Sequence, residues 1–445
     1  MISDFSLFRV VASLRSIILL LVFSAVSAQA EFRFPMPEFA SGYQHPPVYT
    51  PAPSNVMAGW DIVVLLAALT LAAIFVLKRR KRREIFLLTL FSLLYFGFWR
   101  NGCVCSVGSI QNVATGLCNP SFGVPLTVLI FFAAPLIFAL LFGRVFCAAV
   151  CPLGAIQEAV AVKPMKVPLA VEKVLSMVPY IYLGLAMLLV ALGSGFFICR
   201  YDPFVGFFRM GASSSLLIVG GIMLVLGVFV ARPYCRFLCP YGVLLNWASK
   251  LSRRHAAITP ADCIQCGLCA DSCPYNAINK PVSAAAPENR SKGAQRLGLL
   301  ILLIPVLMVI GAGTGGLLRE PLSRMHPTVR LAERIAGEEL GRYKGMTIES
   351  FAFRASDTPN EKLYAEAVTL KEKFGRGGKW LGAFIGFVIG CKLIAVSVVR
   401  KRTAYEPNRG TCYSCGRCFK YCPVKMPCRE KLAGSTPDTA EFRQY

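Results

Sequence analysis

Long apolar runs alternate with short polar segments along most of this 445-residue chain. Seven of the runs approach the roughly 20 residues that an α-helix needs to cross a bilayer. They cover approximately residues 59–77, 85–100, 124–142, 177–194, 213–231, 296–314 and 380–398. The pattern therefore predicts a mainly α, polytopic helical membrane protein with about seven spans.

Residues 1–30 have the pattern of a secretory signal peptide. Two arginines precede the apolar run 17–26, and Ala28-Gln29-Ala30 forms a small-residue cleavage site. A retained first membrane helix is the alternative. Residues 31–58 are rich in proline and aromatic residues, and we expect an extended, exported segment there.

The strongest positive cluster, Lys78 to Arg83, directly follows the first predicted span. Lys and Arg accumulate at the cytoplasmic ends of membrane helices, so this cluster is predicted to lie in the cytoplasm. Alternation then places the loops 101–123, 195–212 and 315–379 outside and the loops 143–176 and 232–295, with the C-terminal tail, inside. The mixed charge of 315–379 indicates a small helical exported segment. The predicted location is a bacterial inner (cytoplasmic) membrane.

Composition agrees with a membrane protein and argues against nucleic acid as a partner. Hydrophobic residues make up 55% of the chain and charged residues only 16%, whereas soluble domains carry about a quarter charged residues. The net charge of +24 fits basic helix ends at a lipid surface.

Two short runs share the spacing C-x2-C-x2-C-x3-C-P: CIQCGLCADSCP at 263–274 and CYSCGRCFKYCP at 412–423. Bacterial ferredoxins hold [4Fe–4S] clusters with this run, and the fourth cysteine of each run ligates the other cluster. We therefore predict one cluster on Cys263, Cys266, Cys269 and Cys422, and a second on Cys412, Cys415, Cys418 and Cys273. Structural zinc sites, the alternative, usually lack this compact run.

Two predicted spans, 296–314 and 380–398, separate the two ferredoxin runs. An even number of crossings returns the chain to the same side of the membrane. The halves at 251–295 and 399–445 can therefore form one small cytoplasmic ferredoxin-like 2[4Fe–4S] domain beside a membrane domain at 59–250.

A second repeat lies in the membrane domain, as FCAAVCPLGAIQE at 146–158 and YCRFLCPYGVLLN at 234–246. Cysteines at positions i and i+4 share one helical face, and the following Pro and Gly end or turn the helix. The four thiols are those of Cys147, Cys151, Cys235 and Cys239. They suit an iron–sulfur cluster or a zinc ion, while free thiols and small packing residues are the alternatives.

Arg144, Arg232 and Arg236 flank these C-x3-C-P pairs. They can stabilise an anionic thiolate site or anchor the ends of the helices in the interface, and we favour anchoring.

Four further cysteines fall in the predicted outward loops: Cys103, Cys105, Cys118 and Cys199. The phrase CSVGSIQN at 105–112 resembles CPLGAIQE at 151–158, which suggests a related turn. A relay across a hydrocarbon core about 30 Å thick needs redox centres near both faces, so we predict an outer cluster on these four. Two disulfides and free thiols are the alternatives. Cys391 is expected to pack inside the last span, and Cys428 receives no role.

The combination of two C-x3-C-P elements with two ferredoxin runs resembles the NosR/NapH-type membrane polyferredoxins. The resemblance covers roughly residues 60–280 and 405–428. It implies electron transfer between the quinone pool or a cytoplasmic donor and carriers or enzymes outside the membrane. NosR-like members carry an exported flavin-binding domain, whereas only residues 31–58 precede the first predicted span here. The interruption of the ferredoxin halves by two spans also departs from the family pattern.

The expected function is therefore a membrane electron-transfer subunit, a carrier in an oxidoreductase complex. It would relay electrons through two [4Fe–4S] clusters, and one or two further iron–sulfur clusters at membrane cysteines, to an exported flavin-binding or reductase partner. A redox-sensing regulator with the same clusters is the rival. A transporter is less favoured, because the spans carry few of the charges that transport paths need.

Overall fold

The computed structural model describes residues 55–102, 105–119, 122–162, 164–209, 214–258, 263–282, 290–343, 345–356, 359–398 and 402–424. The predicted signal peptide, nearly all of the predicted exported segment, Cys103 and Cys428 lie outside these ranges.

The first half of the described chain is a bundle of helices, several of them short. In chain order they are α2 (Asn55–Ile74) with its π-helical continuation η1 (Phe75–Arg79), α3 (Arg82–Ser92) with η2 (Leu93–Trp99), α4 (Ser106–Cys118), α5 (Leu126–Phe142), η3 (Phe146–Val150), α6 (Pro152–Val160), α7 (Leu169–Leu175), α8 (Val178–Ala191), α9 (Phe197–Tyr201), α10 (Val205–Phe208), α11 (Ser214–Phe229), α12 (Pro233–Phe237) and α13 (Pro240–Lys250).

The second half consists of a long helical hairpin and two small ferredoxin halves. Its elements are α14 (Leu268–Asp271), β1 (Ile278–Asn279), α15 (Arg290–Leu317), α16 (Arg319–Ser323), α17 (Pro327–Glu339), α18 (Ile348–Arg354), α19 (Asn360–Ser397), β2 (Glu406–Pro407) and α20 (Arg417–Tyr421).

The mainly α fold with membrane helices is confirmed. Within the described ranges, four helical stretches are long and apolar enough to cross a membrane: Met57–Arg79, Leu169–Ala191, Ser291–Leu317 and Asn360–Ser397. The predicted spans 124–142 and 213–231 fall on shorter apolar helices, Leu126–Phe142 and Ser214–Phe229. The predicted span 85–100 falls on α3 and η2, and the span 380–398 is the second half of the longer helix α19.

The positive cluster after the first span forms a tight turn. Only Arg80 and Lys81 separate η1 from α3, and Arg80 adopts the left-handed conformation with φ of 53°. Because the turn is so short, α2 and α3 form a hairpin that presents the whole cluster at one end. Apolar side chains of α2, including Leu65, Leu69 and Ala72, are buried in the bundle core.

Helices α15 and α19 pack together through glycines along their length. A Cβ atom on Gly382 would lie within 1.8 Å of the Gly311 carbonyl oxygen, and one on Gly315 within 2.0 Å of the Gly378 oxygen. Small residues let membrane helices approach closely enough for backbone contact. These glycines therefore set the spacing of the two helices.

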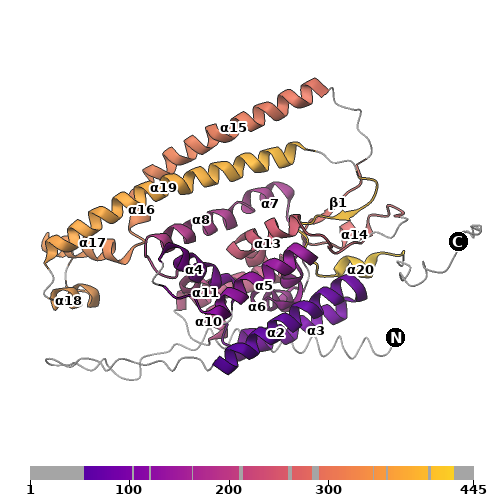
Figure 1. The fold of residues 1–445 in the computed structure, drawn as a ribbon, viewed down its shortest axis with the longest axis horizontal. Coiled ribbons are helices and arrows are strands. Elements are labelled where there is room, and N and C mark those ends of the chain that lie inside the picture. The colour runs from indigo at the N-terminus through magenta and orange to yellow at the C-terminus, as the bar shows by residue number, and fades with distance from the viewer. Residues whose placement is uncertain are drawn as a thin grey trace, which may run out of the picture.

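Figure 1 shows this hairpin lying along one side of the bundle. Helices α16 to α18 gather at one end of it, and the ferredoxin elements α14, β1 and α20 lie at the opposite end of the molecule. The segment 315–379 is helical and has a small core of its own, in which Val329, Ala332 and Ile335 pack against Leu363 and Ala367.

We expect Gly382→Ala to force α15 and α19 apart, because the added methyl group has no room beside Gly311. Overpacking of this kind costs about 1–3 kcal/mol, and thermal unfolding in detergent measures it. Gly298→Ala on α15 is the matched control, since a Cβ there meets no atom within 4 Å. Equal melting temperatures for the two variants would contradict the close packing.

Candidate iron–sulfur sites

The two ferredoxin halves meet, although two long helices separate them in the sequence. Strands β1 and β2 pair antiparallel, with Ile278 opposite Pro407 and Asn279 opposite Glu406. The rings of Tyr275 and Tyr413 lie 4.8 Å apart across the junction. The halves thus form one small unit.

Each predicted ferredoxin quartet lines a cavity of its own. The first cavity has Cys263, Cys266, Cys269 and Cys422 in its wall, and the second has Cys273, Cys412, Cys415 and Cys418. Gly267 and Gly416 adopt φ of 77° and 73° beside these cavities. Such left-handed values come readily to glycine, so the loops can curl around the cavities. The fourth cysteine of each run reaches the other run's cavity.

The C-x3-C-P cysteines line a third cavity, with an empty volume of about 290 Å³. All four, Cys147, Cys151, Cys235 and Cys239, are buried. Within each motif one helix ends and a new helix begins, so the two cysteines of a motif do not lie on one continuous helix. Cys151 and Cys239 are extended N-cap residues, and the following proline is the first residue of α6 or α13, where proline is well tolerated.

Each of the two C-x3-C-P repeats has an arginine that packs against the other repeat. Arg144 precedes Cys147 by three residues, and its Nη2 atom lies 3.3 Å from where a Cβ on Gly242 would be. Arg232 stands in the same relation to Cys235, and its Nη1 atom lies 3.4 Å from the Cβ position of Gly154. The motif glycine of each repeat therefore leaves room for the arginine of the other.

These arginines correct the sequence interpretation of Arg144 and Arg232 as interface anchors. Both side chains are buried, at 5% and 1% exposure, so neither reaches for water. Arg144 donates towards Cys147 Sγ at 3.7 Å, and Gln157 Nε2 donates to Cys235 Sγ at 3.3 Å. Donors aimed at sulfur stabilise thiolate ligands and the clusters they hold. Arg236 pairs with Glu172 at 2.5 Å.

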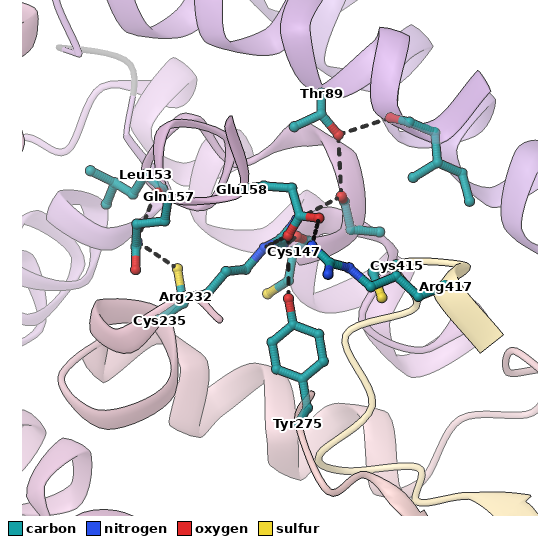
Figure 2. A network of polar contacts seen from close by, with 12 residues as sticks. Thr89, Cys147, Leu153, Gln157, Glu158, Arg232, Cys235, Tyr275, Cys415 and Arg417 are labelled. Atoms are coloured by element: carbon teal, nitrogen blue, oxygen red, sulfur yellow. Dashed lines mark hydrogen bonds and ion pairs between the residues drawn. The ribbon is translucent and has the colours of Figure 1, made fainter. Parts of the chain in front are cut away.

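Glu158 lies at the centre of a buried network that joins the membrane motifs to the ferredoxin halves (Figure 2). Its carboxylate is 2% exposed and pairs with Arg232 at 3.1 Å, Arg417 at 2.7 Å and Arg82. The hydroxyl of Tyr275 donates to it at 3.3 Å. The sequence around Glu158 does not indicate this role, because its partners come from distant segments of the chain.

The charge state of Glu158 follows from these partners. Burial by itself would raise the pKa of Glu158, but the charges of Arg82, Arg232 and Arg417 outweigh it and hold that pKa well below its usual range. The carboxylate is therefore ionised at any physiological pH.

Direct hydrogen bonds connect the second ferredoxin quartet to the membrane quartet. The Tyr413 hydroxyl donates to the carbonyl oxygen of Cys235 at 3.1 Å, and Arg144 lies 4.2 Å over the Tyr413 ring. Arg82 donates to the Cys415 carbonyl oxygen at 2.6 Å. The two cavities are thus neighbours with a fixed relative position.

Of the predicted outer site, the structure describes Cys105, Cys118 and Cys199, and it does not bring these three together. Cys105 precedes α4 and Cys118 ends it, so the two are separated by about 20 Å at 1.5 Å per residue. Cys199 packs near Cys105 instead, with its Sγ atom 2.8 Å from the Cβ position of Gly108. Cys105 also shares a cavity wall with Cys151 of the membrane quartet.

The donor set fits iron–sulfur clusters at three places. Each of the three cavities is lined by four cysteines, the ligand set of a [4Fe–4S] cluster. A cubane occupies the space between its ligands, so thiols around a cavity suit it. Among the residues that the structure describes, no group of three or more Cys, His, Asp or Glu is arranged around a single ion.

Family models for a 4Fe-4S binding domain match two parts of the chain. One matches residues 124–168 and 213–258, which contain one C-x3-C-P motif each. The other matches residues 256–279, the first ferredoxin run.

Three relatives illustrate what the chain is similar to. It is 30% identical over 156 residues to the putative electron transport protein YccM of Escherichia coli, covering 31% of this chain and 43% of YccM. It is 30% identical over 252 residues to the regulatory protein NosR of Pseudomonas aeruginosa, covering 49% of this chain and 34% of NosR. An uncharacterized protein of Methanocaldococcus jannaschii, MJ0750, is 31% identical over 197 residues, which is 42% of this chain and 79% of that protein.

The chain belongs to the NosR/NapH-type membrane polyferredoxins. Membership and the 4Fe-4S domains support a membrane iron–sulfur role in electron transport or regulation. This polyferredoxin spans less than half the length of YccM and of NosR. No solved structure matches it.

We expect Glu158→Gln to destabilise the polyferredoxin by about 3–5 kcal/mol, because it leaves the buried guanidinium group of Arg232 and the partly buried ones of Arg82 and Arg417 without their carboxylate. Thermal unfolding in detergent measures the change. Glu84→Gln is the matched control: Glu84 pairs with Arg79, an exposed residue, and should cost less than about 1 kcal/mol. Similar costs for the two variants would contradict the central role of Glu158.

The difference in stability between the wild type and Glu158→Gln should depend on pH. A carboxyl whose folded pKa is lowered contributes stability that is complete above its unfolded pKa, about 4.3, and is lost as the pH falls through the folded pKa. The stability difference between wild type and Glu158→Gln should therefore stay constant from pH 8 to about pH 5 and shrink in stronger acid. Melting temperatures across this range test it; a difference that vanishes near neutral pH would contradict it.

Proposed function

We propose that this polyferredoxin relays electrons between a quinol or cytoplasmic donor and an exported acceptor. Two ferredoxin clusters and one membrane cluster would form the path. A [4Fe–4S] cluster accepts and donates one electron at a time, and the protein supplies position, charge and insulation. The observation that carries the proposal is the contiguity of the three cysteine-lined cavities.

The order of the path follows from the contacts. The two ferredoxin quartets exchange their fourth cysteines, which brings the first and second sites together. Tyr413, between two ligands of the second site, donates a hydrogen bond to Cys235 of the membrane site. Short separations with bonded contacts favour electron tunnelling, because its rate falls steeply with distance.

The proposed orientation has the ferredoxin domain in the cytoplasm, at the inner membrane, with seven spans. In its support, two residues of the basic cluster contact the second ferredoxin half: Arg80 lies 5.0 Å over the Phe419 ring and Arg82 donates to Cys415. The positive-inside rule assigns that cluster to the cytoplasm. Helices α16 to α18, at the opposite end of the molecule, would then be exported (Figure 1).

Cys105 offers a route from the membrane site towards the outside. It shares a cavity wall with Cys151, and the exposed Cys199 packs beside the first turn of the helix that Cys105 precedes. Burial raises the pKa of the neighbouring Asp202 to about 6, and the Tyr234 hydroxyl donates to that carboxylate at 3.0 Å. This polar group ties the outer loop to the second C-x3-C-P motif.

A redox-sensing regulator is the second candidate function, favoured by the link between the exported helices and the ferredoxin halves. Helices α15 and α19 carry α16 to α18 at one end, and each leads directly to one ferredoxin half at the other. A change at the clusters could be transmitted along this hairpin. NosR, one of the relatives, is itself named a regulatory protein.

Cys239→Ser should remove about a third of the bound iron, from about twelve to about eight atoms per chain at four per cluster. Iron and acid-labile sulfide in the purified protein measure this. Cys118→Ser and Cys391→Ser are controls, and neither should change the iron content. Unchanged iron in Cys239→Ser would remove the membrane cluster from the proposal.

Sealed liposomes containing a trapped electron acceptor distinguish relay from sensor. With the ferredoxin domain outside, a relay reduces the trapped acceptor when an external reductant is added, and Cys239→Ser slows this at least tenfold. A sensor leaves the acceptor oxidised although its clusters are reduced. The second result would overturn the proposed relay.

A further inference from the structure

A large cavity lies beside the membrane quartet, with Cys235, Cys239 and Tyr413 in its wall, and the proposed electron path assigns no ligand to it. It contains about 1410 Å³ of empty space, part of it open to the surroundings. Its wall includes residues of α7, α8, α12, α13, the last turns of α19 and the segment 408–413 of the second ferredoxin half. The cavity therefore lies where the membrane helices meet the ferredoxin unit.

The charges in this wall are strongly unbalanced. Four cationic side chains line it, Arg144, Arg236, Lys250 and Lys392, against the single carboxylate of Glu172. That carboxylate is already bound to Arg236 at 2.5 Å. Arg144 faces the Cys147 thiol, so the two lysines remain without an anionic partner in the wall. Gathering like charges next to apolar surroundings is costly unless an anion accompanies them.

The two lysines are placed to bind an anion together. Lys250 is the last residue of α13, and Lys392 lies in the last two turns of α19. The Lys392 ammonium group donates to Ser176 Oγ at 2.6 Å and to its carbonyl oxygen at 2.8 Å. An ammonium group has three donors, so one remains for a ligand.

The same cavity has an apolar and aromatic side. The rings of Tyr180 and Trp247 lie 6.0 Å apart, and Lys392 stands 4.9 Å over the Tyr180 ring. Trp247 and Phe387 remain 41% and 45% exposed. Tryptophan is enriched at the headgroup level of a bilayer. A ligand that fills this cavity must therefore carry both a negative charge and an apolar part.

We propose that this cavity binds the phosphodiester headgroup of an anionic phospholipid from the leaflet next to the ferredoxin halves. Basic pockets between membrane helices bind such headgroups in other proteins. Lys250 and Lys392 hold the phosphate, and the acyl chains leave past Trp247 and Phe387. A neutral quinone leaves the positive charges unbalanced, and a free phosphate ion leaves the aromatic side uncovered.

The bound lipid has a structural consequence. Tyr413, which donates to Cys235, stands in the same wall as residues of α8, α13 and α19. A headgroup in the cavity contacts all of these elements and holds the second ferredoxin half against the membrane helices. This inference does not depend on the direction of electron flow or on the identity of donor and acceptor.

Native mass spectrometry of the delipidated full-length protein, titrated with phosphatidylglycerol or phosphatidylcholine, tests the proposal. Phosphatidylglycerol should bind at least tenfold more tightly than phosphatidylcholine. Lys250→Ala/Lys392→Ala should remove this preference, and Lys250→Arg/Lys392→Arg should keep it, which separates charge from folding. Lys362→Ala/Lys373→Ala changes two exposed lysines of α19 and is the matched control.

Three outcomes would overturn the proposal. Equal binding of the two lipids would show that charge is not recognised. Displacement of the lipid by millimolar inorganic phosphate would assign the site to a free anion. Displacement by an uncharged short-chain quinone, with the lysine variants unaffected, would assign it to a quinone.

Discussion

One buried carboxylate holds the two halves of this protein together. Glu158 meets guanidinium groups from α3, from the segment before α12 and from α20, and it accepts a hydrogen bond from Tyr275. Glu158 and Arg232 would each be a costly buried charge alone, and the pairing of Glu158 with three guanidinium groups makes its burial tolerable. The partners come from the membrane bundle and from both ferredoxin halves. The negative charge of Glu158 is therefore fully compensated only when these parts are docked together.

The membrane site shows a second constraint, the reciprocal relation of two similar motifs. Each C-x3-C-P element contributes two thiols, one arginine and one glycine, and each arginine fits against the glycine of the other element. Neither element can complete the site alone. Cys235 then receives the Tyr413 hydrogen bond, so the site formed by the bundle also becomes the surface on which the ferredoxin unit docks. Packing, electrostatics and the proposed electron path therefore share the same residues.

Local patterns predicted the chemistry of this chain better than they predicted its three-dimensional contacts. The ferredoxin spacing predicted the two groups of four cysteines that line the two ferredoxin cavities, because ligand spacing follows from short-range geometry. The prediction for Cys118 was wrong: a helix runs without a break from Ser106 to Cys118 and carries that thiol away from Cys105. The roles of Glu158 and of Arg144 and Arg232 could not be found from sequence alone, because Glu158 and Arg144 have partners 259 and 266 residues away. A charged residue near a predicted span looks the same whether it faces water or a buried network.

The central claim is that a membrane cluster at the C-x3-C-P cysteines lies next to a ferredoxin cluster. EPR spectroscopy of the partly reduced protein tests it most directly, because neighbouring paramagnetic clusters broaden and relax each other's signals. The account predicts a broadened, fast-relaxing signal that becomes sharp and slow-relaxing in Cys239→Ser. Signals from two ferredoxin clusters alone, with the same line shape and relaxation in wild type and variant, would contradict it.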